Sequence, residues 1–356
     1  MPEKTLKEKT AKGLMWGTIS NGAQLVLGTL FGIFLARILS PSDYGMVGLL
    51  TVFSQIASVL QDSGFRTALA NRREIVHEDY NAVFWFNVGT SCVMYLLLFF
   101  LAPLITEFYQ HSDAAANQDL SELTPLARFS FLGFVIASLG TAHYAYLFRT
   151  LQVKQKAIIT VISLTTSSTI GLTMALKGYA YWGLATQGIA FTTCNTILFW
   201  YFSKWRPTLP VSFHPLKEMF GFSSKLLAND ICNNINGNIL SVMLGRFYAV
   251  HDVGLYNQAN KWTSMVSTMV LGTIKDVAQP VLRNVETERE RHKRVFRKML
   301  RFNAFMVFPA LFGLALISRE LILITVTEKW LDCVPLMQIL CAGDLLGHGG
   351  LARGHV

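Results

Sequence analysis

The chain has 356 residues, of which 52% are hydrophobic and only 15% are charged, and its formal net charge is +9. Soluble domains carry about 25% charged residues, so the composition excludes a soluble globular protein as well as disordered, collagen-like, coiled-coil and disulfide-stapled chains. It indicates a polytopic membrane protein, whose positive charge we expect in its loops rather than against nucleic acid.

Apolar segments of about 20 residues, the length that crosses roughly 30 Å of hydrocarbon, recur along the chain between short polar stretches. In lipid each span must satisfy its own backbone hydrogen bonds, and the patterning of these segments is helical rather than alternating. The sequence therefore predicts an all-α polytopic membrane protein, a helix bundle and not a barrel. Its predicted spans are 14–39, 44–68, 81–105, 124–147, 157–176, 181–202, 218–246, 254–280, 302–326 and 332–346.

Lysine and arginine gather at alternate ends of the predicted spans, which fixes the expected orientation. One side receives the basic residues of 4–12, 66–73, 149–156, 204–217 and 283–301. The other side receives few, and its longest loop, from Thr106 to Ser121, has none. Because cytoplasmic loops hold the excess of positive charge, we expect a cytoplasmic N-terminus. The basic segment 283–301 is then a cytoplasmic loop, partly amphipathic helix, lying against anionic lipid.

A short internal repeat marks two span junctions, LARILSPSDYG and LGRFYAVHDVG. Both copies place an arginine, an aspartate and a glycine at the same spacing: Arg37, Asp43 and Gly45 in the first, Arg246, Asp252 and Gly254 in the second. An even number of predicted spans separates the copies, so both have the same orientation, as in transporters built from two parallel halves. In the first copy we expect Ser42 or Asp43 to cap the second helix, with Pro41 in its first turn.

Polar residues inside spans are costly in lipid, which makes them candidates for function. In the span 254–280, Lys261 and Lys275 belong to a row of polar residues spaced by three or four, so one helix face is polar throughout. The spans 218–246 and 14–39 carry similar polar faces. The substrate-binding candidates for a water-filled cavity between two lobes are Lys225, Asn229, Asn233, Lys261, Lys275, Asn21 and Gln24.

Two interpretations of these polar faces remain open. Asparagine and small residues also join helices within a closed bundle, without forming any cavity. A solvated cavity that contains lysines would instead attract an anionic headgroup, for which phosphate or pyrophosphate is the natural choice.

Two further intramembrane groups, Asp62 and His143, are candidates for ion coupling. Asp62 lies four residues before Arg66, so a local helical ion pair is the alternative, and a lone histidine such as His143 is more often a packing element. The sequence has no Asp-x-Asp pair, zinc-ligand spacing, Gly-x-Ser-x-Gly turn or phosphate-binding glycine loop. We therefore expect a protein that is not an enzyme, with no catalytic residues, no metal and no cofactor.

An ordered set of motifs runs through the chain: LKEKTAKGLMWG, FLARILSPSDYG, DSGFRTAL, FWFN, FSKWRP, FGFSSKLL, DVGLYNQANKW and ITVTEKWLDCVPLMQILCAG. With these motifs, over about residues 4–342, the sequence resembles the Wzx-type polysaccharide-exporting flippases of bacteria. They form the colanic-acid-exporter-like branch of the MOP superfamily and are relatives of the MATE drug exporters. The resemblance implies a two-lobed, MOP/MATE-like transmembrane helix bundle in the bacterial cytoplasmic (inner) membrane.

For function, the resemblance implies movement of an undecaprenyl-pyrophosphate-linked oligosaccharide from the cytoplasmic to the periplasmic leaflet by alternating access. This step would serve the synthesis of O-antigen, capsule or exopolysaccharide. The implied partners are the lipid-linked oligosaccharide, membrane lipids and the polysaccharide polymerase and chain-length machinery. On this sequence Lys225, Lys261 and Lys275 would hold the pyrophosphate, which we infer from the helix faces they occupy and not from a family motif.

Two alternatives belong to other classes. A MATE-like secondary exporter of amphipathic small molecules should carry acidic residues in its cavity, and the lysine-bearing spans 218–246 and 254–280 argue against it. A membrane-embedded sugar-transfer enzyme would need a large periplasmic loop or a pair of catalytic carboxylates, and the longest outward loop here is only Thr106 to Ser121.

Members of this family have at least twelve spans, whereas here the match stops near Gly343, so the second lobe is expected to be truncated. We expect residues 1–210 to form an N-terminal lobe of six transmembrane helices. Residues 211–346 would form a partial C-terminal lobe of three complete helices and part of a fourth. Residues 343–356 are expected to be an atypical tail that does not continue an apolar helix.

Overall fold

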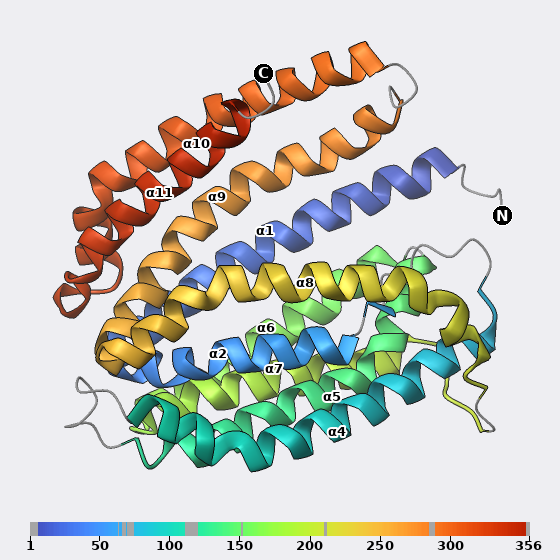
Figure 1. Ribbon diagram of the computed structural model, residues 1–356, viewed down its shortest axis with the longest axis horizontal. Coiled ribbons are helices and arrows are strands. Elements are labelled where there is room, and N and C mark those ends of the chain that lie inside the picture. The colour runs from blue at the N-terminus through green and yellow to red at the C-terminus, as the bar shows by residue number, and fades with distance from the viewer. Residues whose placement is uncertain are drawn as a thin grey trace. The chain divides into compact units, whose positions relative to one another are not determined.

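The structure of the chain is a computed structural model that describes residues 6–62, 64–65, 69, 75–110, 120–150, 152–209, 212–284 and 289–353. The described residues form long helices with no strand among them (Figure 1). The elements are α1 (Leu6–Ile38), α2 (Pro41–Asp62), α4 (His77–Gln110), α5 (Leu123–Arg149), α6 (Val153–Leu176), α7 (Ala180–Phe202), α8 (His214–Phe247), α9 (Val250–Asn284), α10 (Arg289–Thr325), the 3-10 turn η1 (Glu328–Trp330) and α11 (Cys333–Arg353). Each predicted span overlaps one of these helices, which confirms the expected all-α fold.

Among the described residues, six helices are long and apolar enough to cross a membrane: α1 from Met15, α2, α4, α5, α6, and α10 from Arg297. Large apolar side chains that are exposed on α4, among them Val93, Phe100 and Leu104, provide the surface that a lipid environment requires. The helices α7, α8 and α9 coincide with three further predicted spans but are not among the six. Amide and hydroxyl side chains along these three helices suit the polar interior of a membrane bundle.

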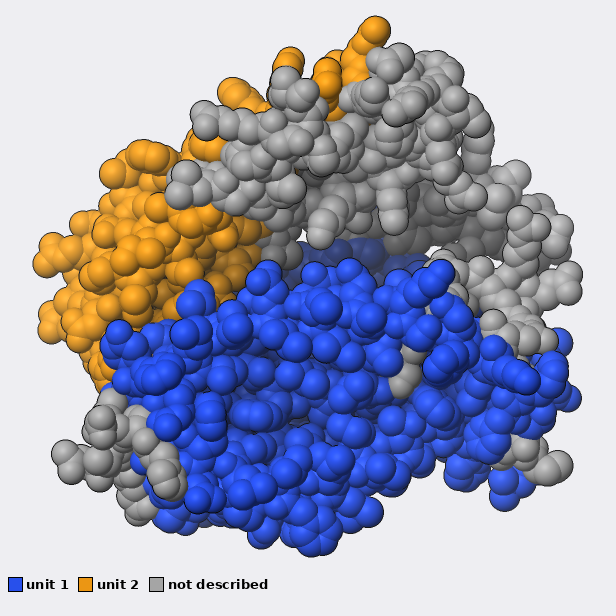
Figure 2. All heavy atoms as spheres, in the orientation of Figure 1, with its two compact units in different colours: residues 1–250 blue, residues 251–356 orange. Residues whose placement is uncertain are grey.

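The chain divides into two compact units, residues 1–250 and 251–356, which Figure 2 shows in different colours. In the first unit α8 packs against α2 and α4, although its sequence position predicts that this helix belongs to the second lobe. The lobe boundary at residue 210 stays a prediction. In the second unit α10 packs against α11, and Ser267 of α9 donates a hydrogen bond to Asp344 of α11 at 3.0 Å. The apolar part of α11 ends at Asp344, and the helix itself continues to Arg353.

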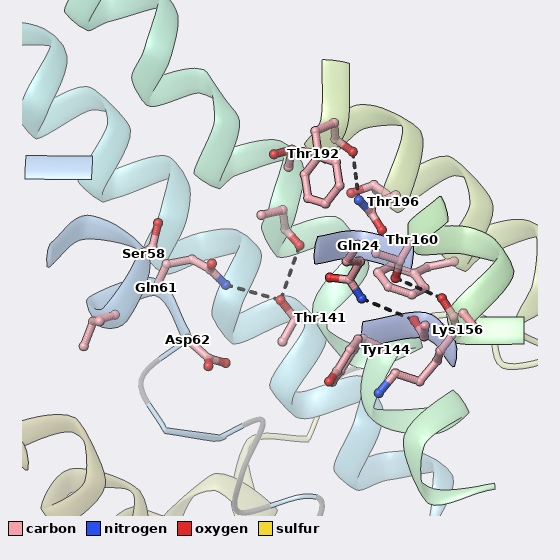
Figure 3. A pocket seen from close by; sticks show the side chains of 18 of the residues that line it. Gln24, Ser58, Gln61, Asp62, Thr141, Tyr144, Lys156, Thr160, Thr192 and Thr196 are labelled. Carbon is pink, nitrogen blue, oxygen red and sulfur yellow. Dashed lines mark hydrogen bonds between the residues drawn. The ribbon is translucent and has the colours of Figure 1, made fainter. Parts of the chain in front are cut away.

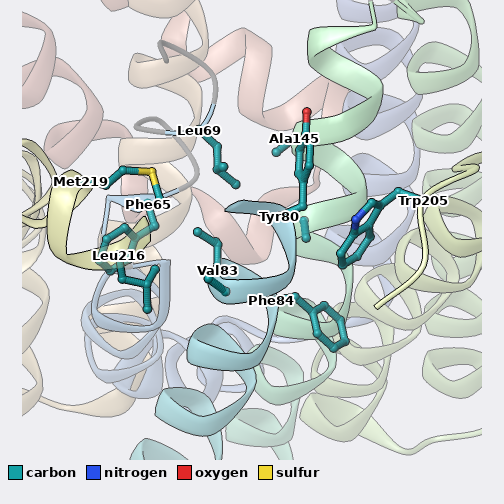
Figure 4. Close-up of a cluster of buried hydrophobic side chains, with 11 residues drawn as sticks. Phe65, Leu69, Tyr80, Val83, Phe84, Ala145, Trp205, Leu216 and Met219 are labelled. Atoms are coloured by element: carbon teal, nitrogen blue, oxygen red, sulfur yellow. The ribbon is translucent and has the colours of Figure 1, made fainter. Parts of the chain in front are cut away.

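A hydrophobic core of the first unit joins the start of α4, the end of α5 and the segment after α7 (Figure 4). The ring of Trp205 lies 6.0 Å from that of Tyr80 and 5.8 Å from that of Phe84, measured between centroids. Beside this core, Asn81 Nδ2 donates to the carbonyl oxygen of Thr208 at 2.8 Å, and the Thr208 N–H donates to Asn81 Oδ1 at 3.0 Å. This reciprocal pair holds the segment that follows α7 against α4.

The first copy of the internal repeat forms a tight junction between α1 and α2. The Ser40 N–H donates to Asp43 Oδ2 at 2.8 Å, and the Asp43 N–H donates to Ser40 Oγ at 3.3 Å. This reciprocal arrangement is a capping box, in which Ser40 precedes the helix and Asp43 is its third residue. The expectation that Ser42 caps the helix is therefore wrong, whereas Asp43 does take part. The second copy lies at a similar junction, between α8 and α9.

Candidate functional site

The first unit contains a cavity of about 750 Å³ lined by α1, α2, α5, α6, α7 and α8 (Figure 3). Small-molecule sites have volumes of roughly 300–1,000 Å³, so the cavity is large enough for a ligand. Its polar lining side chains are Ser20, Asn21, Gln24, Ser58, Gln61, Asp62, Thr141, Tyr144, Lys156, Thr160, Thr192, Asn195, Thr196, Asp230 and Asn234. Because polar groups inside a membrane bundle are costly, this concentration of amides and hydroxyls marks a candidate binding site.

Two glycines allow close approach between the elements that line the cavity. A Cβ atom at Gly140 of α5 would lie 3.2 Å from Thr196 Oγ1 of α7. Gly64 follows α2 with a φ of +70°, a conformation that other residues rarely adopt, and a Cβ there would lie 2.7 Å from the carbonyl oxygen of Ser223 of α8. These positions bring α5 against α7, and the end of α2 against α8.

Hydrogen bonds between helices fix the wall that α2, α5 and α7 form. Gln61 Nε2 of α2 donates to Thr141 Oγ1 of α5 at 3.4 Å, and both side chains are buried. Thr196 Oγ1 of α7 donates to the carbonyl oxygen of Ile136 of α5 at 3.1 Å. Partners on separate helices restrict the rotamers of these side chains, so this wall is ordered before any ligand enters.

The charged residues of the lining are Asp62, Asp230 and Lys156. The ammonium group of Lys156 lies 4.1 Å from the ring centroid of Tyr144 and 4.7 Å from that of Phe148, and the two rings are stacked. Aromatic faces attract cations, so these rings stabilise the positive charge of the lysine at the cavity wall. The lining thus has two carboxylates and one ammonium group, so its acidic residues outnumber its basic ones. The described part of the chain holds no group of three side chains suited to a metal ion.

Three of the residues predicted from the sequence lie in this cavity, namely Asn21 and Gln24 of α1 and Asp62 of α2. Gln24 is held in place because its Nε2 donates to Ser20 Oγ, one turn earlier, at 3.2 Å. Residues predicted on two successive helices, α1 and α2, thus line the same cavity.

The other predicted residues lie elsewhere. Lys225, Asn229 and Asn233 are exposed on α8 and are not part of the lining, although Asp230 and Asn234 of the same helix are. Lys261 is exposed on α9 in the second unit. The side chain of Lys275, also on α9, lies outside the described residues, so its proposed role stays a prediction.

His143 lies in an aromatic environment and is not among the lining residues. It is fully buried, and its ring centroid is 4.4 Å from that of Trp200 and 5.0 Å from that of Trp205. Neither ring nitrogen has a hydrogen-bond partner among the described residues. These surroundings favour the packing interpretation, and a role in ion coupling stays a prediction. The ion pair expected between Asp62 and Arg66 cannot be placed, since Arg66 lies outside the described part.

Several lining residues, above all those of α6 and α7, do not stand out in the sequence as site candidates. On α6, Lys156 and Thr160 are four residues apart, and on α7, Thr192, Asn195 and Thr196 lie on one face. The same spacing that identified the polar face of 254–280 is present here, over a single turn. So short a pattern is also typical of hydroxyls that bond to their own helix, and for this reason it did not single out a site.

A family model described as "Polysaccharide biosynthesis protein" matches residues 34–335. The chain is similar to the lipopolysaccharide biosynthesis protein WzxC of Escherichia coli (strain K12), with 29% identity over 350 residues covering 96% of this chain and 68% of WzxC. It is 24% identical to the teichuronic acid biosynthesis protein TuaB of Bacillus subtilis (strain 168), covering 96% and 69%. It is 25% identical to the succinoglycan biosynthesis transport protein ExoT of Rhizobium meliloti (strain 1021), covering 94% and 66%. The chain thus spans about two-thirds of the length of these relatives.

Two solved structures have a similar fold. The lipid II flippase MurJ, in an inward closed conformation, superimposes with a TM-score of 0.73 at 14% identity, covering 96% of this chain and 76% of MurJ. An inward-facing multidrug resistance MATE family transporter of the MOP superfamily gives a TM-score of 0.67 at 15% identity, covering 94% and 80%. At such low identity the likeness shows the fold alone, and it confirms the expected MOP/MATE-like helix bundle.

Proposed function

This chain belongs to the polysaccharide biosynthesis protein family, and we propose that it is a flippase for an undecaprenyl-pyrophosphate-linked oligosaccharide. The observation that carries the proposal is the family match over residues 34–335 on a chain with the MOP-superfamily fold. One relative, ExoT, is itself named a transport protein. We place the protein in the bacterial inner membrane with its N-terminus in the cytoplasm, where it moves the substrate to the periplasmic leaflet.

The main physical obstacle to this movement is the sugar. A hydroxyl group that enters hydrocarbon without a hydrogen-bond partner costs roughly 2–7 kcal/mol, and an oligosaccharide has many such groups. A cavity lined by amides and hydroxyls replaces the lost bonds to water, while the lipid chain stays in the bilayer. We propose that alternating access of such a cavity to the two sides moves the sugar across.

The pyrophosphate requires positive charge. We propose that Lys225, Lys261 and Lys275, the lysines identified from the sequence, attract this group, because charge-assisted hydrogen bonds to phosphate are short and strong. The translocated product would then pass to the polysaccharide polymerase and chain-length machinery.

A second candidate function, MATE-like export of amphipathic cations, is favoured by one observation. The cavity of the first unit carries Asp62 and Asp230 together with the aromatic side chains of Tyr144, Phe191 and Phe199. Carboxylates and aromatic faces are the groups that attract an organic cation. The family match weighs against this candidate, since it connects the chain with polysaccharide biosynthesis.

Deletion of the gene in the bacterium that encodes the protein tests these functions against one another. A flippase deletion is expected to remove surface polysaccharide and to leave the complete lipid-linked oligosaccharide on the cytoplasmic leaflet. Accumulation of an incomplete oligosaccharide would instead indicate a sugar-transfer enzyme. Normal surface polysaccharide with greater sensitivity to cationic amphiphiles would indicate the MATE-like exporter and overturn the flippase proposal.

A further inference from the structure

Five of the hydroxyl groups that line the cavity of the first unit donate their protons to backbone carbonyl oxygens. Thr141, Thr160 and Thr192 each donate to the backbone carbonyl four residues earlier, at 3.3, 2.9 and 3.1 Å. Ser58 does the same at 2.8 Å, and Thr196 donates to a carbonyl of the neighbouring α5. A hydroxyl whose proton is engaged offers only its oxygen lone pairs to a ligand. These side chains therefore present acceptors toward the cavity.

Two carboxylates of the lining add further acceptors, and two of its amides each have one N–H engaged. The carboxylates of Asp62 and Asp230 accept hydrogen bonds and donate none when ionised. Asn195 and Asn234 each direct an amide N–H to the backbone of their own helix, at 3.0 and 2.8 Å. Lys156 is the one basic residue of the described lining. A phosphate group offers acceptors and negative charge, so it is mismatched to this cavity, whereas a ligand rich in O–H donors is matched.

Aromatic rings complete the lining. Tyr144 contacts Phe199 edge-to-face, with centroids 5.6 Å apart, and Phe191 also lines the cavity. Aromatic faces are electron-rich, so they pack against groups whose surface is weakly positive. The C–H faces of a sugar ring meet this description, while its hydroxyls meet the acceptors.

From the hydrogen-bond acceptors and aromatic rings of this lining we propose that the cavity of the first unit binds the saccharide part of the carried molecule. The contacts are made through the hydroxyl groups of uncharged sugar units. The inference rests on the proposed flippase function and makes it more specific, because it separates two binding tasks. The sugar occupies the acceptor-rich cavity, and the pyrophosphate is left to lysines outside its lining.

The test is binding of free ligands to the purified full chain in lipid nanodiscs, followed by saturation-transfer NMR. The probes are neutral oligosaccharides of two to four hexose or N-acetylhexosamine units, inorganic pyrophosphate and tetraphenylphosphonium. The informative variant is Thr160→Val, which replaces a lining hydroxyl by a methyl group of similar size. Its matched control is Thr169→Val on the same helix, because Thr169 is exposed, bonds to its own helix in the same way at 2.8 Å and does not line the cavity. Asn195→Leu provides a second lining variant.

We expect at least one oligosaccharide to bind, to be displaced by neither pyrophosphate nor tetraphenylphosphonium, and to lose about tenfold in affinity in Thr160→Val and Asn195→Leu but not in Thr169→Val. Absence of oligosaccharide binding, or displacement by either ion, would overturn the inference. Flipping of a lipid-linked oligosaccharide by the unmodified protein in vesicles is measured in parallel. Flipping without sugar binding would refute only this inference, whereas sugar binding without flipping would refute the proposed function.

Discussion

Gly45 of α2 packs directly against the carbonyl oxygen of Val250, the first residue of α9. The two residues belong to the two copies of the internal repeat, LARILSPSDYG and LGRFYAVHDVG, which lie far apart in the sequence. Both copies are short junctions between long helices, and the absence of a side chain at residue 45 lets these junctions touch. The glycine of the first copy therefore has a packing role that its spacing from Arg37 and Asp43 did not reveal.

A side chain at residue 45 should weaken this junction. In Gly45→Ala the new methyl group would overlap the Val250 carbonyl, and overpacking of this kind typically costs about 1–3 kcal/mol. We expect a lower thermal unfolding temperature for the purified protein in detergent. Gly28→Ala on α1 is the control, because no atom lies within 4 Å of its Cβ position, and alanine favours a helix over glycine. Equal unfolding temperatures for both variants would contradict the packing role.

The capping box at the start of α2 gives a second prediction. Ser40→Ala removes the hydroxyl that accepts from the Asp43 N–H, and loss of such a cap costs about 0.5–2 kcal/mol. Ser42→Ala, two residues later, should have little effect because Ser42 is exposed. Thermal unfolding of the two variants distinguishes them, and a larger effect of the Ser42 change would show that the helix begins elsewhere.

His143 can be tested as a packing element. Because its ring lies among aromatic rings, His143→Phe should preserve both folding and the pH dependence of transport. His143→Ala should reduce stability by about 2–5 kcal/mol, since it leaves a cavity in a well-packed region. Transport as a function of pH in vesicles is the measurement. A folded His143→Phe protein that has lost its pH dependence would establish the ion-coupling role instead.

The lysines proposed for pyrophosphate give a fourth prediction. Lys225→Gln and Lys261→Gln, made separately, should each lower the initial flipping rate about tenfold, because a charge-assisted bond to phosphate is worth roughly 1.5–3 kcal/mol. Lys177→Gln is the control, since this lysine is exposed directly after α6 and is not among the candidates. Flipping rates unchanged in the first two variants would remove these lysines from the proposed mechanism.

The helices were predictable from the sequence because a span must be about 20 residues long, largely apolar and internally hydrogen-bonded. The ends of the helices were harder to predict. Whether Ser40 or Ser42 caps α2 depends on where the helix begins, to within two residues, and serine is a favourable capping residue at either position. The association of α8 with α2 and α4 could not be predicted either, since the polar face of one helix does not specify which helices it meets.

The candidate site was predicted only in part. Asn21, Gln24 and Asp62 were singled out because they interrupt apolar spans, and they line the cavity. Lys156 and Asn195 were not singled out as site candidates. A lysine one turn inside a helix is typical of an interfacial anchor, and a single amide is typical of helix packing. Which polar residues share a cavity depends on how the helices are rotated against one another, and this information is absent from the spacing within any one helix.

The most direct measurement is flipping in vesicles that contain the purified chain and a lipid-linked oligosaccharide labelled on its sugar with a fluorophore. A membrane-impermeant quencher reports which label faces outward. We expect that the label of the inner leaflet becomes accessible in vesicles with protein, without nucleotide hydrolysis, and stays protected in vesicles without protein. Protection that is equal in both kinds of vesicle would contradict the proposal that this chain moves lipid-linked oligosaccharides.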